Sequence, residues 1–250
     1  KGQAKLCKTK VLVIGCGGLG SEAAVHLAAS GIGKIHLIDF DKIDLTNLHR
    51  QVFYKEKDVN KYKAKTLAEY IMSINSSVLV SYDTSKIEKS NIRKIVSNFD
   101  FILDCTDDLH TKYLINDACV LENKILIYGS LHKFEGHVAV FNSKDSKGNR
   151  TTNLRDVYPE IPTESIPSCS EVGTLNPIVS IIANMQVNEV LKLVLEIGIP
   201  LTNKMLVFNS LDYSQMFLKL KVNSKTKLSS IWKTETYMSN SIEFCNLNEV

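Results

Sequence analysis

Short apolar runs alternate with helix-like patterns along roughly the first half of the chain. The runs over 10–15, 34–39, 78–82 and 99–104 are rich in branched residues and have the length of buried strands. Apolar residues spaced by three and four predict helices around 23–28, over 58–72, weakly over 87–97, and around 114–121. Strands that alternate with helices in this way indicate an α/β fold with a doubly wound, Rossmann-like and mainly parallel sheet.

The pattern changes in the second half of the chain. Strands are predicted over 124–130 and 134–141, the second antiparallel because only a short turn separates them. Residues 142–170 lose the periodicity and contain three prolines that exclude a regular helix, so we expect a long loop. A long apolar helix over 176–197, in the core or at a dimer interface, precedes strands at 204–210 and 215–221. One domain over 1–221 is expected, with antiparallel strands in its C-terminal half and a polar tail over 222–250 of unassigned role.

Composition narrows the class of protein further. The chain has 250 residues, 44% of them hydrophobic, and 30 basic against 27 acidic side chains without a long basic block, so nucleic acid is not indicated as a partner. The apolar runs are shorter than a membrane span and the start lacks a signal-peptide core, so we expect a cytoplasmic protein without a membrane partner. Six widely spaced cysteines form no CxxC pair, so reduced thiols and no zinc site are expected.

A glycine-rich turn follows the first predicted strand directly. Glycines at 15, 17, 18 and 20 let the backbone bend sharply and present bare N–H groups to a phosphate at the start of the next helix. Asp39 ends the second strand 19 residues after Gly20, which is the offset at which an acid reaches a ribose hydroxyl. The strand, turn, helix and acid together predict a nucleotide-binding site.

Polar side chains are dense just after that acid, where Asp41, Thr46, Asn47 and Arg50 follow within eleven residues. A nicotinamide site does not need this density, whereas an arginine and an amide suit a polyphosphate and carboxylates suit a metal ion. Taken singly, each of these residues is better interpreted as a solvated loop residue.

Five stretches taken in order resemble the ThiF/MoeB/HesA family of ubiquitin-activating-enzyme-like adenylyltransferases: GCGGLGSE, DFDKIDLTNLHRQ, the lysine of YKAK, DCTDD and SCSEVGTLNP. The resemblance covers about residues 2–220 and makes 1–221 an adenylation domain with a crossover loop over 142–170. It implies ATP-dependent activation of the C-terminal glycine of a ubiquitin-like sulfur-carrier protein ending in Gly-Gly, for thiazole or molybdopterin supply, with release of pyrophosphate. It also implies a homodimer.

The same resemblance implies roles for individual residues. Arg50 and Lys63 would contact phosphate, and Asp107, followed by Asp108 at the nucleotide site, would hold Mg²⁺. Cys169 occupies the place of the family's thioester- or persulfide-forming cysteine, although an inert buried thiol is the ordinary alternative.

The sequence also departs from the family pattern. Most relatives hold a structural zinc with two CxxC pairs, and this chain reads Arg155 to Pro159 where the first pair would lie, so packing alone is expected to close that region. The sequence also does not show the arginine that relatives carry ahead of the segment resembling this start. Three alternatives therefore stay open: adenylation of a ribosomal peptide, a non-catalytic carrier-binding scaffold, and an NAD-dependent oxidoreductase.

Overall fold

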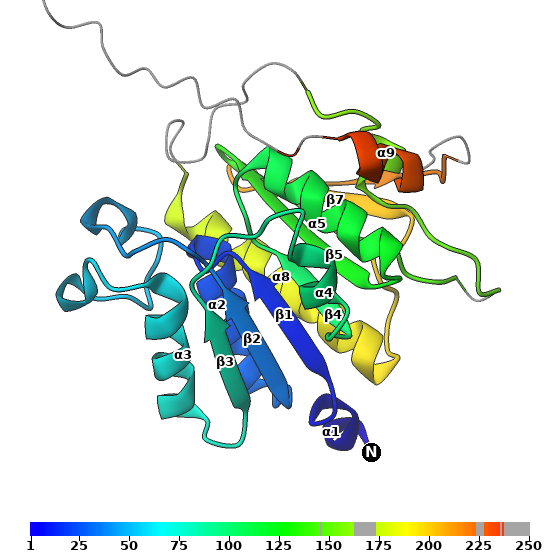
Figure 1. Ribbon diagram of the computed structural model, residues 1–250. Helices are drawn as coiled ribbons and strands as arrows, with labels where there is room; N and C mark the ends of the chain where they lie inside the picture. Colours follow the sequence, from blue (N-terminus) through cyan, green and yellow to red (C-terminus); the bar gives the residue numbers. More distant parts are fainter. Residues whose placement is uncertain (146, 163–173, 224–227, 236, 238–250) are drawn as a thin grey trace, which may run out of the picture.

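Eight strands form a single mixed sheet in the computed structural model, which describes residues 1–145, 147–162, 174–223, 228–235 and 237. Its spatial order is β3-β2-β1-β4-β5-β6-β7-β8 (Figure 1). The strands are β1 (Lys10–Ile14), β2 (Lys34–Ile38), β3 (Leu79–Asp83), β4 (Phe101–Asp104), β5 (Ile125–His132), β6 (Glu135–Phe141), β7 (Lys204–Asn209) and β8 (Gln215–Lys219). The first five run parallel, and β6, β7 and β8 pair antiparallel, which confirms the predicted fold class.

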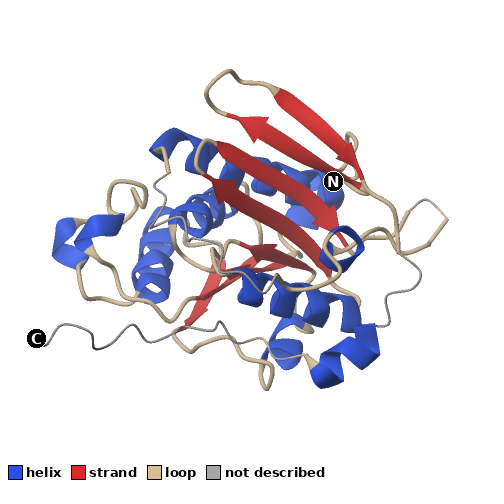
Figure 2. Ribbon diagram, turned by 90° about the horizontal axis from the view of Figure 1, so that it is seen from above, coloured by secondary structure: helices blue, strands red, loops and turns tan. Residues whose placement is uncertain are grey.

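Helices cover both faces of the parallel part of the sheet, as Figure 2 shows from above, whereas β8 at the antiparallel edge is exposed. One face packs against α2 (Gly18–Ala29), α3 (Lys63–Ile74) and α8 (Asn176–Leu195), with α1 (Gly2–Leu6) beside α8. The other face packs against α4 (Ile92–Val96), α5 (Leu109–Leu121), α6 (Leu154–Val157) and α9 (Leu228–Thr234). Short 3₁₀ turns at η1 (Leu45–Asn47) and η2 (Glu56–Asp58) shape the loop between β2 and α3.

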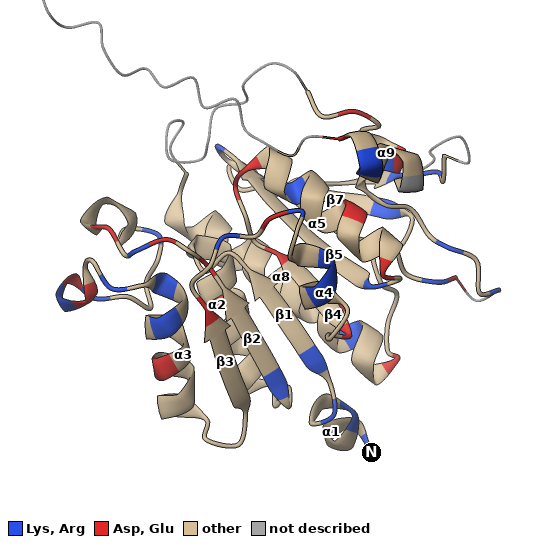
Figure 3. Cartoon of the chain, viewed as in Figure 1, with Lys and Arg blue, Asp and Glu red and all other residues tan. Residues whose placement is uncertain are grey.

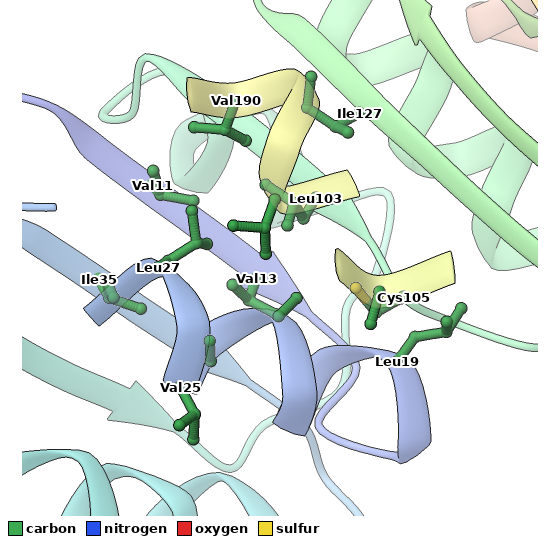
Figure 4. Packing of buried hydrophobic residues seen from close by; sticks show 14 of the residues in the cluster. Val11, Val13, Leu19, Val25, Leu27, Ile35, Leu103, Cys105, Ile127 and Val190 are labelled. Carbon is green, nitrogen blue, oxygen red and sulfur yellow. The ribbon is translucent and has the colours of Figure 1, made fainter. Parts of the chain in front are cut away.

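The first strand shows why the sequence folds this way. Lys10 is exposed, and the four branched residues after it are buried, because a central parallel strand is covered on both faces. Val11 and Val13 pack with residues of α2 and α8 (Figure 4). Leu12 and Ile14 belong to the cluster that contains the apolar residues of α5. Lys10 and Lys34 begin β1 and β2, and the ribbons of these two strands are otherwise uncharged (Figure 3).

The helix α8 is the longest helix in the described part of the chain. Its length and its mean hydropathy of 1.5 over an 18-residue window would suffice to cross a membrane, and 44% of that window is buried in the domain. Ile178, Ile182, Val187 and Val190 pack into the core against the sheet and α2. Burial in a globular core accounts for the same composition, so the feature is weak support for a membrane span.

The structure corrects the predicted boundaries of two helices. The helix predicted over 58–72 begins five residues later, at Lys63, because residues 56–58 form a separate 3₁₀ turn. The helix predicted over 87–97 is a single five-residue turn, α4.

Two segments for which the sequence predicted no helix or strand contain helices. The 142–170 loop includes α6, which Asn153 caps by accepting a hydrogen bond from the Arg155 N–H at 2.8 Å. The polar tail includes α9, whose Trp232 packs against the α5 side of the core.

The region that we expected to close by packing alone is held by charge. Arg155 is 1% exposed, and its guanidinium makes bonds of 2.7–3.0 Å to both carboxylate oxygens of Asp117 on α5. It also lies over the Tyr113 ring and 3.2 Å from Glu235. The Tyr237 hydroxyl donates to Asp117 at 2.6 Å. The tail therefore completes a buried ion-pair network that the sequence pattern did not reveal.

Candidate active site at the carboxyl edge of the sheet

A cavity of about 530 Å³ lies where β1, β2, β4 and β5 end. Ten of the residues predicted to bind the nucleotide line it: Gly15, Gly17, Gly18, Asp39, Asp41, Asn47, Arg50, Lys63, Asp107 and Asp108. Parallel strands bring their carboxyl ends to one edge, so residues more than 90 positions apart in sequence meet there. Two predicted residues, Thr46 and Gly20, are outside this lining.

The glycine turn is shaped by close backbone contacts. Gly15 has a φ of +87°, and a Cβ there would lie 2.8 Å from the Cys105 carbonyl oxygen. A Cβ on Gly20 would lie 1.8 Å from the Gly15 carbonyl oxygen, so Gly20 serves the packing of α2 on the turn. At Gly17 the nearest atom to such a Cβ is Gln51 Nε2 at 3.5 Å, and the space above this glycine belongs to the cavity.

Asp39 is fixed by the backbone at the end of β2. Its Oδ2 accepts from the Cys16 N–H at 2.6 Å, and its Oδ1 accepts from the Asp41 N–H at 2.8 Å. Burial raises the pKa of this carboxyl above its usual value, although Lys63 and the two backbone donors oppose the shift. The carboxylate thereby ties the glycine turn to the loop after β2.

A chain of polar contacts orders that loop. Asn47 Oδ1 accepts from Gln51 Nε2 at 3.1 Å, and Arg50 Nη1 lies 3.3 Å from His49 Nε2. Thr46 bonds through its hydroxyl and its N–H to Asp44, at 2.6 and 2.8 Å, and these bonds lower the pKa of the Asp44 carboxyl. Thr46 therefore stabilises the loop, and a contact of its own with the nucleotide stays a prediction.

Lys63 begins α3 and is only 6% exposed. This position confirms the prediction that Lys63 lies on the first turn of a helix. The side chain lines the cavity, and its Nζ donates a hydrogen bond to Asp41 Oδ2 at 2.9 Å. Tyr54 links the glycine turn to this helix, because its hydroxyl lies 2.6 Å from the Cys16 carbonyl oxygen and 3.4 Å from that of Lys63.

Asp107 and Asp108 differ in their surroundings. Asp108 caps α5 by accepting from the Thr111 N–H at 2.7 Å, so its carboxylate is committed to the helix. Asp107 is exposed and has no hydrogen-bond or ion-pair partner among the described residues. The described residues also hold no group of three or more His, Cys, Asp or Glu side chains placed to bind a metal.

The structure adds residues that the sequence reasoning missed. These additional lining residues are Gln51, Ser85, Lys86, Ile87, Thr111, Lys112 and Thr174. Gln51 is 2% exposed, and its Oε1 has no hydrogen-bond partner among the described residues, so an acceptor is left facing this region. The position of Gln51 next to Arg50 could have indicated that it belongs to the site. Lys86 follows a strand without a recognisable motif, so the sequence contains no such indication for it.

Three of the cysteines are relevant to the site: Cys16, Cys105 and Cys169. Burial raises the pKa of the Cys16 and Cys105 thiols, so neither is a ready nucleophile although Cys105 lines the cavity. Cys169, the predicted reactive thiol, lies outside the described residues together with the rest of 163–173. The proposed thiol chemistry therefore stays a prediction.

Comparison with other sequences gives one consistent answer. The ThiF family model matches residues 1–230. A probable adenylyltransferase/sulfurtransferase MoeZ from Mycobacterium tuberculosis is 38% identical over 226 residues, which cover 90% of this chain and 57% of that protein. A sulfur carrier protein adenylyltransferase from Thermus thermophilus is 31% identical over 248 residues, covering 99% of this chain and 92% of that protein. The chain thus spans little more than half of its mycobacterial relative and nearly all of the one from Thermus.

Solved structures agree on the fold. MccB from E. coli, crystallised with ATP, superposes with a TM-score of 0.78 and 26% identity, covering 91% of this chain and 68% of that one. MccB with MccA-N7isoASN superposes with a TM-score of 0.80 at 24% identity and the same coverage. The likeness covers 91% of this chain and supports the fold class described above.

Proposed function

The chain belongs to the ThiF family, and from this premise we propose that it is an adenylyltransferase that uses ATP to activate a carboxylate. One observation carries the proposal. A single cavity collects the glycine turn, two cationic side chains at Arg50 and Lys63, and the carboxylate of Asp107, which has no partner among the described residues. This combination suits a nucleoside triphosphate better than a dinucleotide, whose two phosphates need neither a lysine nor a second acid.

The substrate that we propose is the C-terminal glycine carboxylate of a small ubiquitin-like sulfur carrier. The relative from Thermus is named for a sulfur carrier protein, and a relative from Gracilaria, 35% identical over 98% of this chain, is named a probable molybdopterin-synthase adenylyltransferase. Attack of a carboxylate oxygen on the α-phosphorus forms the acyl-adenylate and breaks the bond to the β-phosphate, so pyrophosphate leaves. Thiazole and molybdopterin supply both remain open as pathways.

The residues of the site would work mainly by position and charge. Backbone N–H groups of the glycine turn would receive phosphate, and the fixed carboxylate of Asp39 would receive the ribose. Arg50 and Lys63 would neutralise charge that develops on the phosphate oxygens. Lys63 is well suited to this, because burial holds its ammonium at the cavity wall.

Magnesium fits the site only in company with the nucleotide. Asp107 offers a single free carboxylate, and Mg²⁺ is commonly bound by one or two carboxylates together with substrate phosphates and water. When bound, the ion would neutralise phosphate charge. A homodimer and a covalent role for Cys169 belong to the same proposal and rest on the family resemblance. A cytoplasmic location is proposed from the sequence pattern alone.

The test is ATP–pyrophosphate exchange with purified chain and candidate carriers that end in Gly-Gly. Exchange is expected with a carrier and not with the same carrier shortened by its last glycine. Asp107→Ala should reduce exchange about a hundredfold or more, because the transition state loses a charged partner. Glu69→Gln, an exposed acid on α3, is the matched control.

Two outcomes would contradict the proposal. The first is wild-type exchange in Asp107→Ala, which would remove that residue from the site. The second is tight binding of NADH with no binding of ATP, which would favour the oxidoreductase reading. MccB has been crystallised with MccA, so MccA-like peptides belong in the substrate panel as the test of peptide adenylation.

A further inference from the structure

A buried ion pair lies at the wall of the cavity, which its lysine helps to line, and it has no place in the mechanism above. Asp104 ends β4 and is fully buried, and Lys112 on α5 is 4% exposed. Lys112 Nζ lies 3.1 Å from Asp104 Oδ2 and donates to the Gly129 carbonyl oxygen at 2.7 Å. Burying two charges costs several kcal/mol per ion by order of magnitude, and many cores do without such a pair. Its position at the site therefore invites a functional explanation.

The surroundings keep the lysine charged. Burial alone would lower the pKa of Lys112, but the Asp104 carboxylate and the Tyr128 ring region outweigh it and raise the pKa above its usual value. The ammonium lies 4.9 Å from the centre of the Tyr128 ring. The ammonium group thus contacts the Asp104 carboxylate, the Gly129 carbonyl oxygen and the Tyr128 ring, and these three contacts fix its position.

The other oxygen of Asp104 acts on the turn that follows. Its Oδ1 accepts from the Thr106 N–H at 3.0 Å and from the Thr106 hydroxyl at 2.7 Å. Thr106 immediately precedes Asp107, the proposed metal-associated acid. Lys112 therefore holds the Asp104 carboxylate in place. That carboxylate in turn orders the backbone at Thr106, next to Asp107.

The same turn is held from the opposite face of the sheet. Gln186 on α8 is fully buried and donates through Nε2 to the carbonyl oxygens of Asp104 and Ile127, at 3.0 and 3.2 Å. Its Oε1 faces Cys105 Sγ at 3.7 Å, and Figure 4 shows Cys105 between α2 and α8. Gln186 does not line the cavity, so it reaches the site only through this turn.

The 105–108 turn also contacts the glycine loop. The Cys105 N–H donates to the Ile14 carbonyl oxygen at 2.9 Å, and the Cys105 carbonyl lies against Gly15. A shift of the turn by one ångström would move Asp107 relative to the phosphate-binding backbone. Displacements of that size at a site can cost about a hundredfold in rate.

We propose that Asp104, Lys112 and Gln186 are positioning residues, a two-sided clamp that holds the 105–108 turn against the glycine loop and so places Asp107 for the reaction. This inference rests on the proposed function for the meaning of Asp107, but the clamp itself is a property of the protein without nucleotide. It assigns a purpose to a buried charge pair and to a buried amide that the chemistry does not use directly.

The experiment compares two clamp variants with a matched control. Asp104→Leu combined with Lys112→Met removes both charges and so avoids leaving one unpaired. Gln186→Leu weakens the clamp from the α8 side without touching the cavity. The control is Asp117→Leu combined with Arg155→Met, which removes a buried ion pair from the same helix but away from the cavity.

Two readouts are needed, the first independent of activity. Amide hydrogen exchange by NMR on the protein without nucleotide should show the Thr106 amide losing at least about tenfold of its protection in both clamp variants and not in the control. ATP affinity should fall about ten- to a hundredfold in the clamp variants, the range seen when groups that orient a site are removed, and stay within about twofold in the control.

Wild-type Thr106 protection together with wild-type ATP affinity in folded Gln186→Leu would overturn the proposal, even if the double variant fails to fold. An equal loss of affinity in the Asp117 and Arg155 control would overturn it too, because general loosening of α5 would then suffice. Absence of pyrophosphate exchange in the wild-type chain would count against the proposed function alone, since the amide readout does not depend on it.

Discussion

Lys63 and Asp41 are joined twice, once through their side chains and once through their backbones. Lys63 Nζ lies 2.9 Å from Asp41 Oδ2, and the Lys63 N–H donates to the Asp41 carbonyl oxygen at 3.0 Å. The lysine side chain is 8% exposed and the aspartate side chain 49%. The acid can therefore turn into solvent while the lysine stays at the cavity wall, ready for an incoming phosphate.

The first prediction concerns that lysine. Lys63→Met should weaken ATP binding and exchange by about two orders of magnitude, because a fixed cation at the phosphate site would be lost. Lys65→Met on the same helix is the control, since its side chain is 54% exposed and is paired with the exposed Glu69. Equilibrium ATP binding measures both, and equal effects of the two changes would show that general charge on α3 is responsible.

The second prediction separates two glycines of the same turn. Gly20→Ala should destabilise the fold by about 1–3 kcal/mol or more, because its Cβ would meet the Gly15 carbonyl oxygen at 1.8 Å. Gly17→Ala meets only ordinary contact and should fold normally but bind ATP poorly, because Gly17 lines the cavity and a methyl group there would obstruct the approach of a phosphate to the backbone. Denaturant unfolding and ATP titration of both variants check this, and normal ATP binding by Gly17→Ala would be the contrary result.

The third prediction concerns the buried network at Arg155. Arg155→Met leaves the Asp117 carboxylate buried without its guanidinium and should lower the free energy of unfolding by about 3–5 kcal/mol. Adding Asp117→Leu should recover much of that loss, because the unpaired charge is then gone. Urea unfolding of the single and double variants is the measurement. A double variant less stable than the single one would refute the explanation by charge burial.

The fourth prediction is a pH dependence from His36. Burial lowers the pKa of this imidazole, which bonds Ser81 at 2.7 Å and stacks on Phe99. The unfolded chain therefore takes up a proton at a higher pH than the folded chain. The resulting contribution to stability is present above about pH 6.5 and is lost as the pH falls below it.

His36→Gln removes this titration, so its free energy of unfolding should decline less than that of wild type between about pH 6.5 and 5. His26→Gln is the control, because that side chain is 46% exposed at the end of α2. Urea unfolding at several pH values gives the comparison. Parallel pH profiles for wild type and His36→Gln would exclude His36 as the source.

Some of the site was readable from the sequence because its determinants are local. The strand at 10–14, the glycine turn and the acid at 39 follow one another within about thirty residues, and each has a backbone reason for its place. The fold class followed from the same periodicity. The family resemblance, carried by five motifs in order, was confirmed by the match over residues 1–230.

Other features were decided only in the tertiary structure, because the residues concerned lie far apart in the chain and carry no local pattern. Gln186 meets Asp104 across 82 positions, and Tyr237 meets Asp117 across 120. Arg155 reads in the sequence as one more charged loop residue, yet it is the largest fully buried side chain of the described residues. Hydrophobic periodicity places strands and helices, whereas burial of a charge depends on which distant partner the fold brings to it, and sequence spacing does not contain that partner.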